Sequence, residues 1–307
     1  LKPQAGPQEM FMGSPADIVI YGGAAGGGKT FGLLLSALRY YNVPGFGCTI
    51  FRKHNKQIFA QGGLWDESQN VYTGIKGAEM KFSRNLWQFR AKNGRITSKI
   101  TFAHIEREQN LEQWQGSQIC EIGFDELTHF SEKIFFYMLS RNRSSCGVKP
   151  FVRATCNPDA DSWVAKFIEW WIDQETGYPI PERSGVIRWF IRREEVIYWA
   201  DKREELWERF DLETSEDRGK VKSVTFIMST LKDNKELLKI DPGYLANLEA
   251  LPLIERERLL HGNWKIKAAA GLFFKRTQLG EILEKVPQDV IQWVRCWDLA
   301  ATEKSEN

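Results

Sequence analysis

The sequence predicts an α/β fold in which a mostly parallel sheet is flanked by helices. Short apolar runs alternate with stretches of helical periodicity, a glycine cluster joins the first run to the first helix, and a later run ends in two acidic residues. Strands that alternate with helices imply parallel pairing through right-handed crossovers. The 307 residues are enough for one large α/β domain or two smaller ones.

The first 175 residues supply the expected elements of this sheet. Residues 1–16 contain Pro and Gly and are expected to wrap the core as a loop. The β-branched run Asp17–Tyr21 predicts a buried strand, and leucines at helical spacing predict a helix over Thr30–Tyr40. Leu86–Phe89 and Lys99–His104 flank an Asn-Gly pair, which is typical of a β-hairpin. Further strands are expected at Cys48–Arg52, Ile119–Phe124 and Phe151–Cys156, and further helices at Glu132–Arg141 and Ser162–Ile172.

The character of the chain changes after about residue 175. The Pro- and Gly-containing stretch Gly177–Gly185 indicates a boundary, and a charged amphipathic helix is expected over Glu194–Phe210. A strand at Lys222–Ser229 and helices at Tyr244–Leu251 and Leu253–Gly262 should follow, with Gly262 as the C-cap. We therefore predict a core at residues 1–180, a small subdomain at 181–265, and a linker with the start of another domain at 266–307, where Val290–Ala300 is strand-like.

Composition narrows the class of protein. The net charge is only +2, from 42 basic and 40 acidic residues, so binding of nucleic acid would need a local basic patch. Cys48, Cys120 and Cys156 lie in apolar runs, and we expect buried free thiols in a reducing cytoplasm. No apolar run reaches the roughly 18 residues that a membrane span requires.

The strongest motif is a P-loop that lies between the first predicted strand and helix. Backbone N–H groups of such a loop surround a phosphate chain, and the helix N-terminus adds its positive dipole. Lys29 is expected to reach the β- and γ-phosphates, and the Thr30 hydroxyl to bind Mg²⁺. A glycine-rich turn with an incidental lysine is the alternative. The predicted loop consists of Gly23, Ala24, Ala25, Gly26, Gly27, Gly28, Lys29 and Thr30.

A second motif places two carboxylates directly after the strand Ile119–Phe124. Asp125 is expected to bind Mg²⁺, which prefers oxygen ligands, and Glu126 to polarise the attacking water. An acidic N-cap for the next helix is the alternative. Together with the P-loop, this pair predicts an ATPase of the ASCE type with ATP and Mg²⁺ as its ligands.

Several other residues are candidates for the same site. Asn157 ends the strand after the acidic pair, where it could sense the γ-phosphate or hold the water, unless it only forms a turn. Arg141 or Arg143 could neutralise charge on the phosphoryl group, or be surface arginines. Gln8 could read the adenine edge with Phe11 beside it, or be a polar loop residue.

These motifs together resemble the large terminase subunit of tailed bacteriophages, over nearly the whole chain. Ser229–Asn234, Asp241–Tyr244 and Leu260–Trp264 are similar to the lid subdomain that follows the ATPase core in that family. The stretch Arg295–Ala300 looks like the first strand of its RNase H-like nuclease domain, in which Asp298 would be the first metal ligand. Because two-metal nucleases need a cluster of carboxylates, we expect no DNA cleavage by these 307 residues.

The resemblance implies an ATP-driven motor that translocates viral double-stranded DNA into a procapsid. Its implied partners are the portal protein, the small terminase subunit and further copies of the chain in a ring, in the host cytoplasm and away from membranes. Basic residues in the region Arg84–Lys99 are candidates for contacts with DNA phosphates, unless that region is a solvated loop. Some relatives carry an Arg inside the P-loop, whereas this chain has Ala and Gly there, so the arginine finger stays open.

Two other functions are compatible with the motifs. A P-loop helicase would require a second ATPase-like domain, and the sequence shows none. A nucleotide-dependent assembly scaffold would bind ATP without useful turnover, and Glu126 argues against it.

Overall fold

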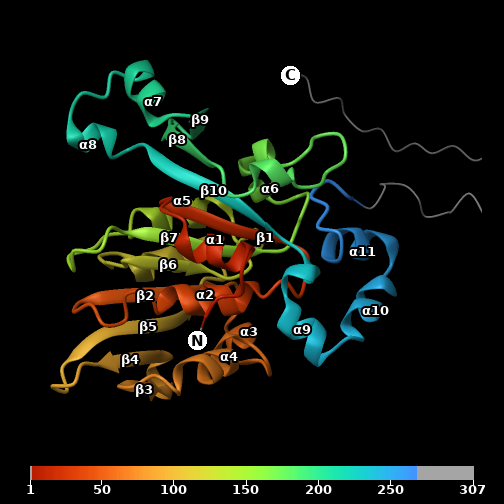
Figure 1. Cartoon of the computed structure of the whole chain (residues 1–307). Helices are drawn as coiled ribbons and strands as arrows, with labels where there is room; N and C mark the ends of the chain where they lie inside the picture. Colours follow the sequence, from red (N-terminus) through yellow and green to blue (C-terminus); the bar gives the residue numbers. More distant parts are fainter. Residues whose placement is uncertain (1, 268–307) are drawn as a thin grey trace, which may run out of the picture. The chain divides into compact units, whose positions relative to one another are not determined.

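The computed structural model describes residues 2–267, and within them the strands form one sheet of ten (Figure 1). Its strand order is β3-β4-β5-β2-β6-β7-β1-β10-β8-β9. The six central strands, from β5 to β10, pair in parallel, and the two strands at each end pair antiparallel. The strands are β1 Ile18–Gly23, β2 Phe46–Arg52, β3 Ala78–Lys81, β4 Leu86–Arg90, β5 Ile96–His104, β6 Glu121–Phe124, β7 Phe151–Cys156, β8 Ile187–Arg193, β9 Val196–Ala200 and β10 Lys222–Ser229.

Helices cover both faces of this sheet, as the predicted α/β class requires. The α-helices are α1 Pro7–Gly13, α2 Lys29–Ala37, α3 Asn55–Phe59, α4 Leu64–Tyr72, α5 Glu132–Leu139, α6 Trp163–Phe167, α7 Arg203–Arg209, α8 Ser215–Arg218, α9 Lys235–Ile240, α10 Tyr244–Glu249 and α11 Leu253–Leu259. The 3-10 helices are η1 Phe82–Arg84, η2 Glu108–Trp114, η3 Leu127–His129, η4 Glu169–Trp171, η5 Pro181–Arg183 and η6 Leu231–Asp233.

The core consists of two apolar layers, one on each face of the sheet. Successive side chains of a strand point to opposite faces, so β1 contributes Ile18 and Ile20 to one layer and Val19 and Tyr21 to the other. The first layer packs against α5 and α6, and the second against α1, α2 and α4. This two-sided burial explains why β1 is apolar throughout, in contrast to the alternating pattern of a half-exposed strand.

The largest error of the sequence prediction lies at Glu194–Phe210. We predicted one helix there, but the structure has the turn Glu194–Glu195, the edge strand β9 and then the shorter helix α7. Both glutamates have positive φ, 47° and 66°, which gives the tight turn that joins β8 to β9. Turns of this kind usually contain Gly, Asn or Asp, so two glutamates did not indicate one. The surrounding charged residues have helical spacing, and this spacing led to the prediction of a single helix.

Other predictions differ in smaller ways. Residues 1–16 contain the helix α1 as well as loop, and the predicted helix Ser162–Ile172 divides into α6 and η4. The predicted hairpin is confirmed as β4 paired with β5. Gly262 has the expected positive φ of 76°, but α11 already ends at Leu259. Cys48, Cys120 and Cys156 are confirmed as buried free thiols, and no helix among residues 2–267 is long and apolar enough to cross a bilayer.

The predicted second segment, residues 181–265, contributes to two parts of the structure. Its strands β8, β9 and β10 belong to the same sheet as the predicted core, so the boundary near residue 180 does not coincide with an edge of the sheet. Helices α9, α10 and α11 follow the sheet and lie beside the end of β1 (Figure 1). The buried Trp264 ends this helical segment, and its ring packs against Phe226 of β10 and beside Gly22 of β1.

A buried carboxylate joins the sheet to the helix that follows the P-loop. Glu121, at the start of β6, is completely buried and accepts a hydrogen bond of 2.7 Å from the Ser36 hydroxyl of α2. Burial raises the pKa of Glu121 to about 7, although the Ser36 hydrogen bond and the charge of Arg153 act in the opposite direction. The protonated, uncharged form of Glu121 is therefore the form that the folded core favours.

We expect the stability of the protein to fall as the pH rises from about 4.5 to about 7, because within this window folding takes up a proton at Glu121, whose pKa is raised from 4.5 to about 7. The Glu121→Gln variant is uncharged at every pH. It should unfold like the wild type at pH 5 and be more stable at pH 8.5, by roughly 1–3 kcal/mol. Thermal unfolding of both proteins at the two pH values measures this difference, and an equal shift at both would contradict the role of the Glu121 charge.

Candidate nucleotide-binding site

The predicted P-loop joins the end of β1 to the start of α2. Its backbone follows a path that glycine permits, with φ of 138° at Gly23 and 73° at Gly26. A Cβ atom at Gly23 would lie only 2.2 Å from the Ser229 carbonyl oxygen at the end of β10. The Ala24 N–H donates to that same oxygen at 2.9 Å, so the loop closes tightly against β10.

Lys29 begins α2 and turns back across the loop. Its side chain is buried, and the ammonium donates to the carbonyl oxygens of Gly23 at 3.3 Å and Ala24 at 2.5 Å. Burial lowers the pKa of Lys29, while the negative charges of Glu126 and Asp125 oppose this shift. The ammonium is therefore held at the loop with the acidic pair close enough to stabilise its charge.

The acidic pair follows β6, as predicted, and its first member is almost fully engaged by the protein. Asp125 is 1% exposed. Its Oδ1 accepts the Thr155 hydroxyl at 2.6 Å, and its Oδ2 accepts Nε–H of Arg52 at 2.7 Å. Arg52 was not among the residues we predicted for the site. Its position at the end of an apolar strand was the available signal.

Glu126 is clamped by Asn157 from the neighbouring strand. The Asn157 side-chain amide donates to Oε1 at 2.9 Å, and its backbone N–H donates to Oε2 at 3.1 Å. Glu126 itself has φ 60° and ψ 62°, a left-handed conformation that costs a non-glycine residue about 1 kcal/mol or more. The surrounding contacts hold the carboxylate in this strained position, which is common at functional sites.

The P-loop, Glu126 and Asn157 line a single pocket of about 420 Å³. Two buried polar atoms at this place lack a hydrogen-bond partner, namely Oδ1 of Asn157 and Oγ of Ser229 beside Gly27. Buried polar groups are normally paired, so these atoms fit a site that takes up a polar ligand or water. The residues present therefore fit a phosphate chain with its Mg²⁺. The remaining lining residues include Gly62 and Glu67 from the α3–α4 region and Asn234 and Leu237 from the α9 region.

Gln8 lies behind the loop with both ends of its amide in use. Its NH₂ donates to the Gly28 carbonyl at 2.9 Å, and its oxygen accepts the Gln4 N–H at 2.9 Å. Phe11 is fully buried and stacks on Tyr21, with ring centroids 5.2 Å apart. This placement speaks against the predicted adenine contact of Phe11, because its ring fills the core under α2.

Asn234 is a site residue that the sequence analysis missed. Its side chain donates to the Gly26 carbonyl at 2.7 Å and accepts from Gln4 at 2.8 Å. The Ala25 N–H donates to the Leu259 carbonyl of α11 at 2.6 Å. The helical segment α9–α11 therefore holds the P-loop directly.

The structure places Arg141 and Arg143 at the opposite end of β6 from the acidic pair. The backbone around them pairs with Ile119, six residues before Asp125, and strands rise about 3.3 Å per residue, so the separation is roughly 20 Å. Arg141 lies over the Tyr137 ring, and Arg143 donates to the carbonyls of Gly116 and Ser117. Neither arginine therefore lies near the phosphate-binding site of its own subunit, which leaves only the open alternative that one of them acts on a neighbouring subunit.

The predicted nuclease ligand Asp298 lies outside the described residues. Within residues 2–267, no group of three or more His, Cys, Asp or Glu side chains has the arrangement of a metal site. Of the two predicted Mg²⁺ ligands, Thr30 lines the nucleotide pocket, and Asp125 precedes the lining residue Glu126 in the chain. Mg²⁺ usually keeps several water ligands, so it does not require a larger cluster of protein carboxylates.

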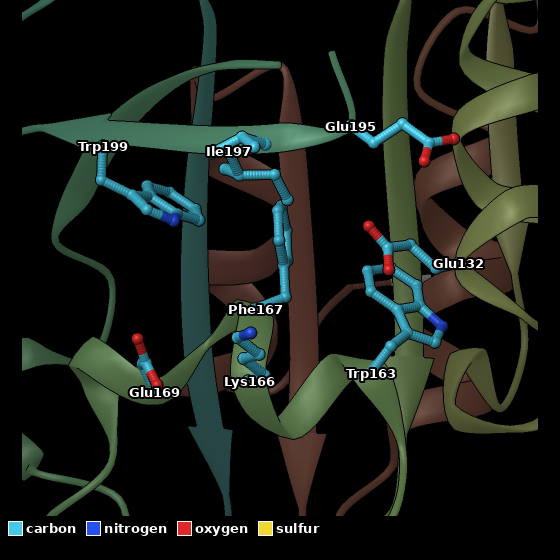
Figure 2. A pocket seen from close by; sticks show the side chains of 9 residues that line it. Glu132, Trp163, Lys166, Phe167, Glu169, Glu195, Ile197 and Trp199 are labelled. Atoms are coloured by element: carbon cyan, nitrogen blue, oxygen red, sulfur yellow. The ribbon is translucent and has the colours of Figure 1, made fainter. Parts of the chain in front are cut away.

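A second cleft, of about 360 Å³, lies between α6 and β9 (Figure 2). Figure 2 shows Lys166 and Phe167 of α6 facing Ile197 and Trp199 of β9. Glu132 at the start of α5 also lines it. Along the chain, helix α5 follows the acidic pair and helix α6 follows Asn157. Each helix that lines this cleft is therefore joined by a short segment of chain to a residue of the nucleotide pocket.

Solved structures with a similar fold include phage large terminases. The large terminase of a thermophilic bacteriophage has 15% identity and a TM-score of 0.54, over 86% of this chain and 54% of that one. The same protein in complex with ATP-γ-S has a TM-score of 0.50 at 15% identity, over 85% and 53%. A variant of the Thermus phage P74-26 large terminase ATPase domain has a TM-score of 0.50 at 11% identity, over 86% and 94%.

At sequence identities this low, the structural similarity shows only that the chain shares the fold of these proteins. The chain spans about half the length of the full terminase that it matches. No curated protein matches the chain by sequence. A family model described as "Terminase large subunit, T4likevirus-type, N-terminal" matches residues 20–281, which is most of the chain. The chain therefore belongs to the family of phage terminase large subunits, to whose N-terminal part it corresponds.

Proposed function

We propose that this chain is the ATP-hydrolysing part of a motor that moves viral double-stranded DNA into a procapsid. The observation that carries the proposal is the single pocket in which the P-loop meets Glu126 and Asn157. Membership in the terminase large-subunit family supports the assignment to DNA packaging.

The residues of the P-loop side would bind the triphosphate and its metal ion. Lys29 would leave the loop carbonyls and donate to the phosphates, and Thr30 and Asp125 would hold Mg²⁺. Bound Mg²⁺ supplies positive charge that stabilises the transferring phosphoryl group. The backbone amides of Gly26, Gly27 and Gly28, directly before α2, would complete an anion site at the helix N-terminus.

Glu126 and Asn157 would act on the attacking water. The two hydrogen bonds from Asn157 fix the Glu126 carboxylate, and they leave Oδ1 of Asn157 free to accept from a water molecule. A positioned carboxylate that takes a proton from water contributes about 10²–10⁴-fold to rate.

The same proposal includes the partners and the moving parts. The helical segment α9–α11 would serve as a lid, because Leu259 and Asn234 bond to the P-loop. Arg141 or Arg143 could reach a phosphate only in the pocket of a neighbouring subunit, which agrees with a ring of copies. We further propose the portal protein and the small terminase subunit as partners in the host cytoplasm, and phosphate contacts to DNA from Arg84–Lys99.

Substitutions at Lys29 and Glu126 should separate binding from hydrolysis. Lys29→Ala should bind a fluorescent ATP analogue at least about tenfold more weakly, since a charged phosphate contact is lost. Glu126→Gln should bind it normally and lower the ATPase rate by about 10²-fold or more. Glu175→Gln, an exposed carboxylate in a surface turn, is the control. Normal turnover by Lys29→Ala would overturn the proposed function, and DNA-stimulated hydrolysis by the wild type would support translocation.

Asn157 variants should affect the rate more than the affinity. Asn157→Ala removes one of the two bonds to Glu126, and we expect kcat to fall about tenfold or more with little change in KM for ATP. Asn157→Asp replaces the amide donor by a second carboxylate that repels Glu126, and kcat should fall at least as far as in Asn157→Ala. Steady-state kinetics at varied ATP concentration measures kcat and KM for both variants. A change in KM alone would show that Asn157 contacts only substrate.

A further inference from the structure

Arg52, Asp125 and Thr155 form a row across three neighbouring strands. In the sheet, Phe51 of β2 lies beside Phe124 of β6, and Phe124 lies beside Ala154 of β7. The next residue of each strand therefore belongs to the same level, and the Asp125 N–H still bonds to the Phe51 carbonyl at 2.9 Å. The sheet itself thus holds an arginine and a hydroxyl on either side of the carboxylate.

Both oxygens of this carboxylate are occupied by the protein. Arg52 donates to Oδ2 at 2.7 Å, and Thr155 donates to Oδ1 at 2.6 Å. Asp125 is 1% exposed, and a buried carboxylate is costly unless a cation compensates it. The Arg52 guanidinium supplies that cation in the structure.

A metal ion and the guanidinium cannot both occupy Oδ2. A carboxylate has about four lone-pair positions, so the Thr155 hydroxyl can stay on Oδ1 when a metal binds. A guanidinium and Mg²⁺ at the same oxygen would repel each other strongly. Arg52 is 19% exposed, which gives its side chain access to solvent on one side.

We propose that Arg52 is an internal counter-ion that occupies Asp125 until the metal ion binds, and so sets the metal affinity of the site. This inference rests on the proposed ATPase function. When the metal ion replaces Arg52, the negative charge of the buried Asp125 carboxylate stays neutralised, by Arg52 before metal binding and by the metal ion after it. Arg52 acts on the reaction through Asp125, as a positioning residue.

The segment that carries Arg52 also contributes to the nucleotide pocket. Strand β2 ends at Arg52, helices α3 and α4 follow, and Gly62 and Glu67 from this region line the pocket. Release of Arg52 therefore changes the support of one pocket wall as the metal site is filled.

Mn²⁺ binding to the nucleotide-free protein tests the proposal without any need for hydrolysis. Titration followed by electron paramagnetic resonance should show that Arg52→Ala binds Mn²⁺ about tenfold more tightly than the wild type, because the competing cation is gone. The melting temperature of Arg52→Ala should also rise more with added Mn²⁺ than that of the wild type. Arg52→Gln, which keeps a neutral donor, replaces Arg52→Ala if the latter does not fold.

Controls assign the effect to the Arg52–Asp125 pair. Arg52→Lys keeps a competing charge and should stay near the wild-type affinity, and so should Lys53→Ala, which removes the next positive charge along the chain. The double variant Arg52→Ala/Asp125→Asn should lose the gain in Mn²⁺ affinity that Arg52→Ala alone shows. Unchanged or weaker Mn²⁺ binding by both neutral Arg52 variants overturns the inference. If the wild type hydrolyses ATP in the same preparation, that result leaves the proposed function intact, whereas an inactive wild type counts against the function itself.

Discussion

The alignment of parallel strand ends is the constraint on which the site depends. Strands β2, β6, β7 and β1 pair in one register, so the residues that follow them emerge at one edge of the sheet. Asp125, Thr155 and the P-loop come together there without any long connection. Strand ends in open α/β sheets commonly place ligand-binding groups in this way. A slip of one residue in β6 would turn Asp125 and Glu126 to the wrong faces.

The sequence predicted the parallel centre of this sheet because its strands are apolar runs bounded by clear signals. The P-loop and the acidic pair were found for the same reason, since their residue types and spacing are visible in one dimension. The edge strands β8 and β9 were not predicted. The turn between them, Glu194–Glu195, has positive φ angles, and glutamate is not a residue type that indicates such a conformation. The role of a single charged residue such as Arg52 depends on which strand lies beside it, and the sequence alone does not show that neighbour.

Contacts between distant segments could not be predicted for similar reasons. The chain from Gln4 through Asn234 to Gly26 joins residues more than 200 positions apart. Arg141 and Arg143 were chosen because they follow the acidic pair in sequence, yet α5 carries the chain back to the far end of β6 before they occur. Distance along the chain was a poor guide to distance in space at these positions.

The P-loop is supported from several directions in this structure. Gln8, Tyr21 and Asn234 each donate to one of its carbonyl oxygens, and Ser229 and Leu259 accept from its N–H groups. The amides of Ala24 and Ala25 are thus engaged by carbonyls of β10 and α11. Rearrangement of the loop around a ligand would change these bonds and so reach both the sheet and the helical segment.

The position of Trp264 has a mechanical consequence. Trp264 lies close to residue 267, at which the described part of the chain ends, and its buried ring packs against Phe226 and beside Gly22, immediately before the P-loop. A pulling force on the chain from its C-terminal side would therefore reach β10 and β1, the strand that leads into the P-loop, through the contacts of Trp264. In the proposed motor, a pulling force on the chain and the binding of nucleotide would therefore both act on β1.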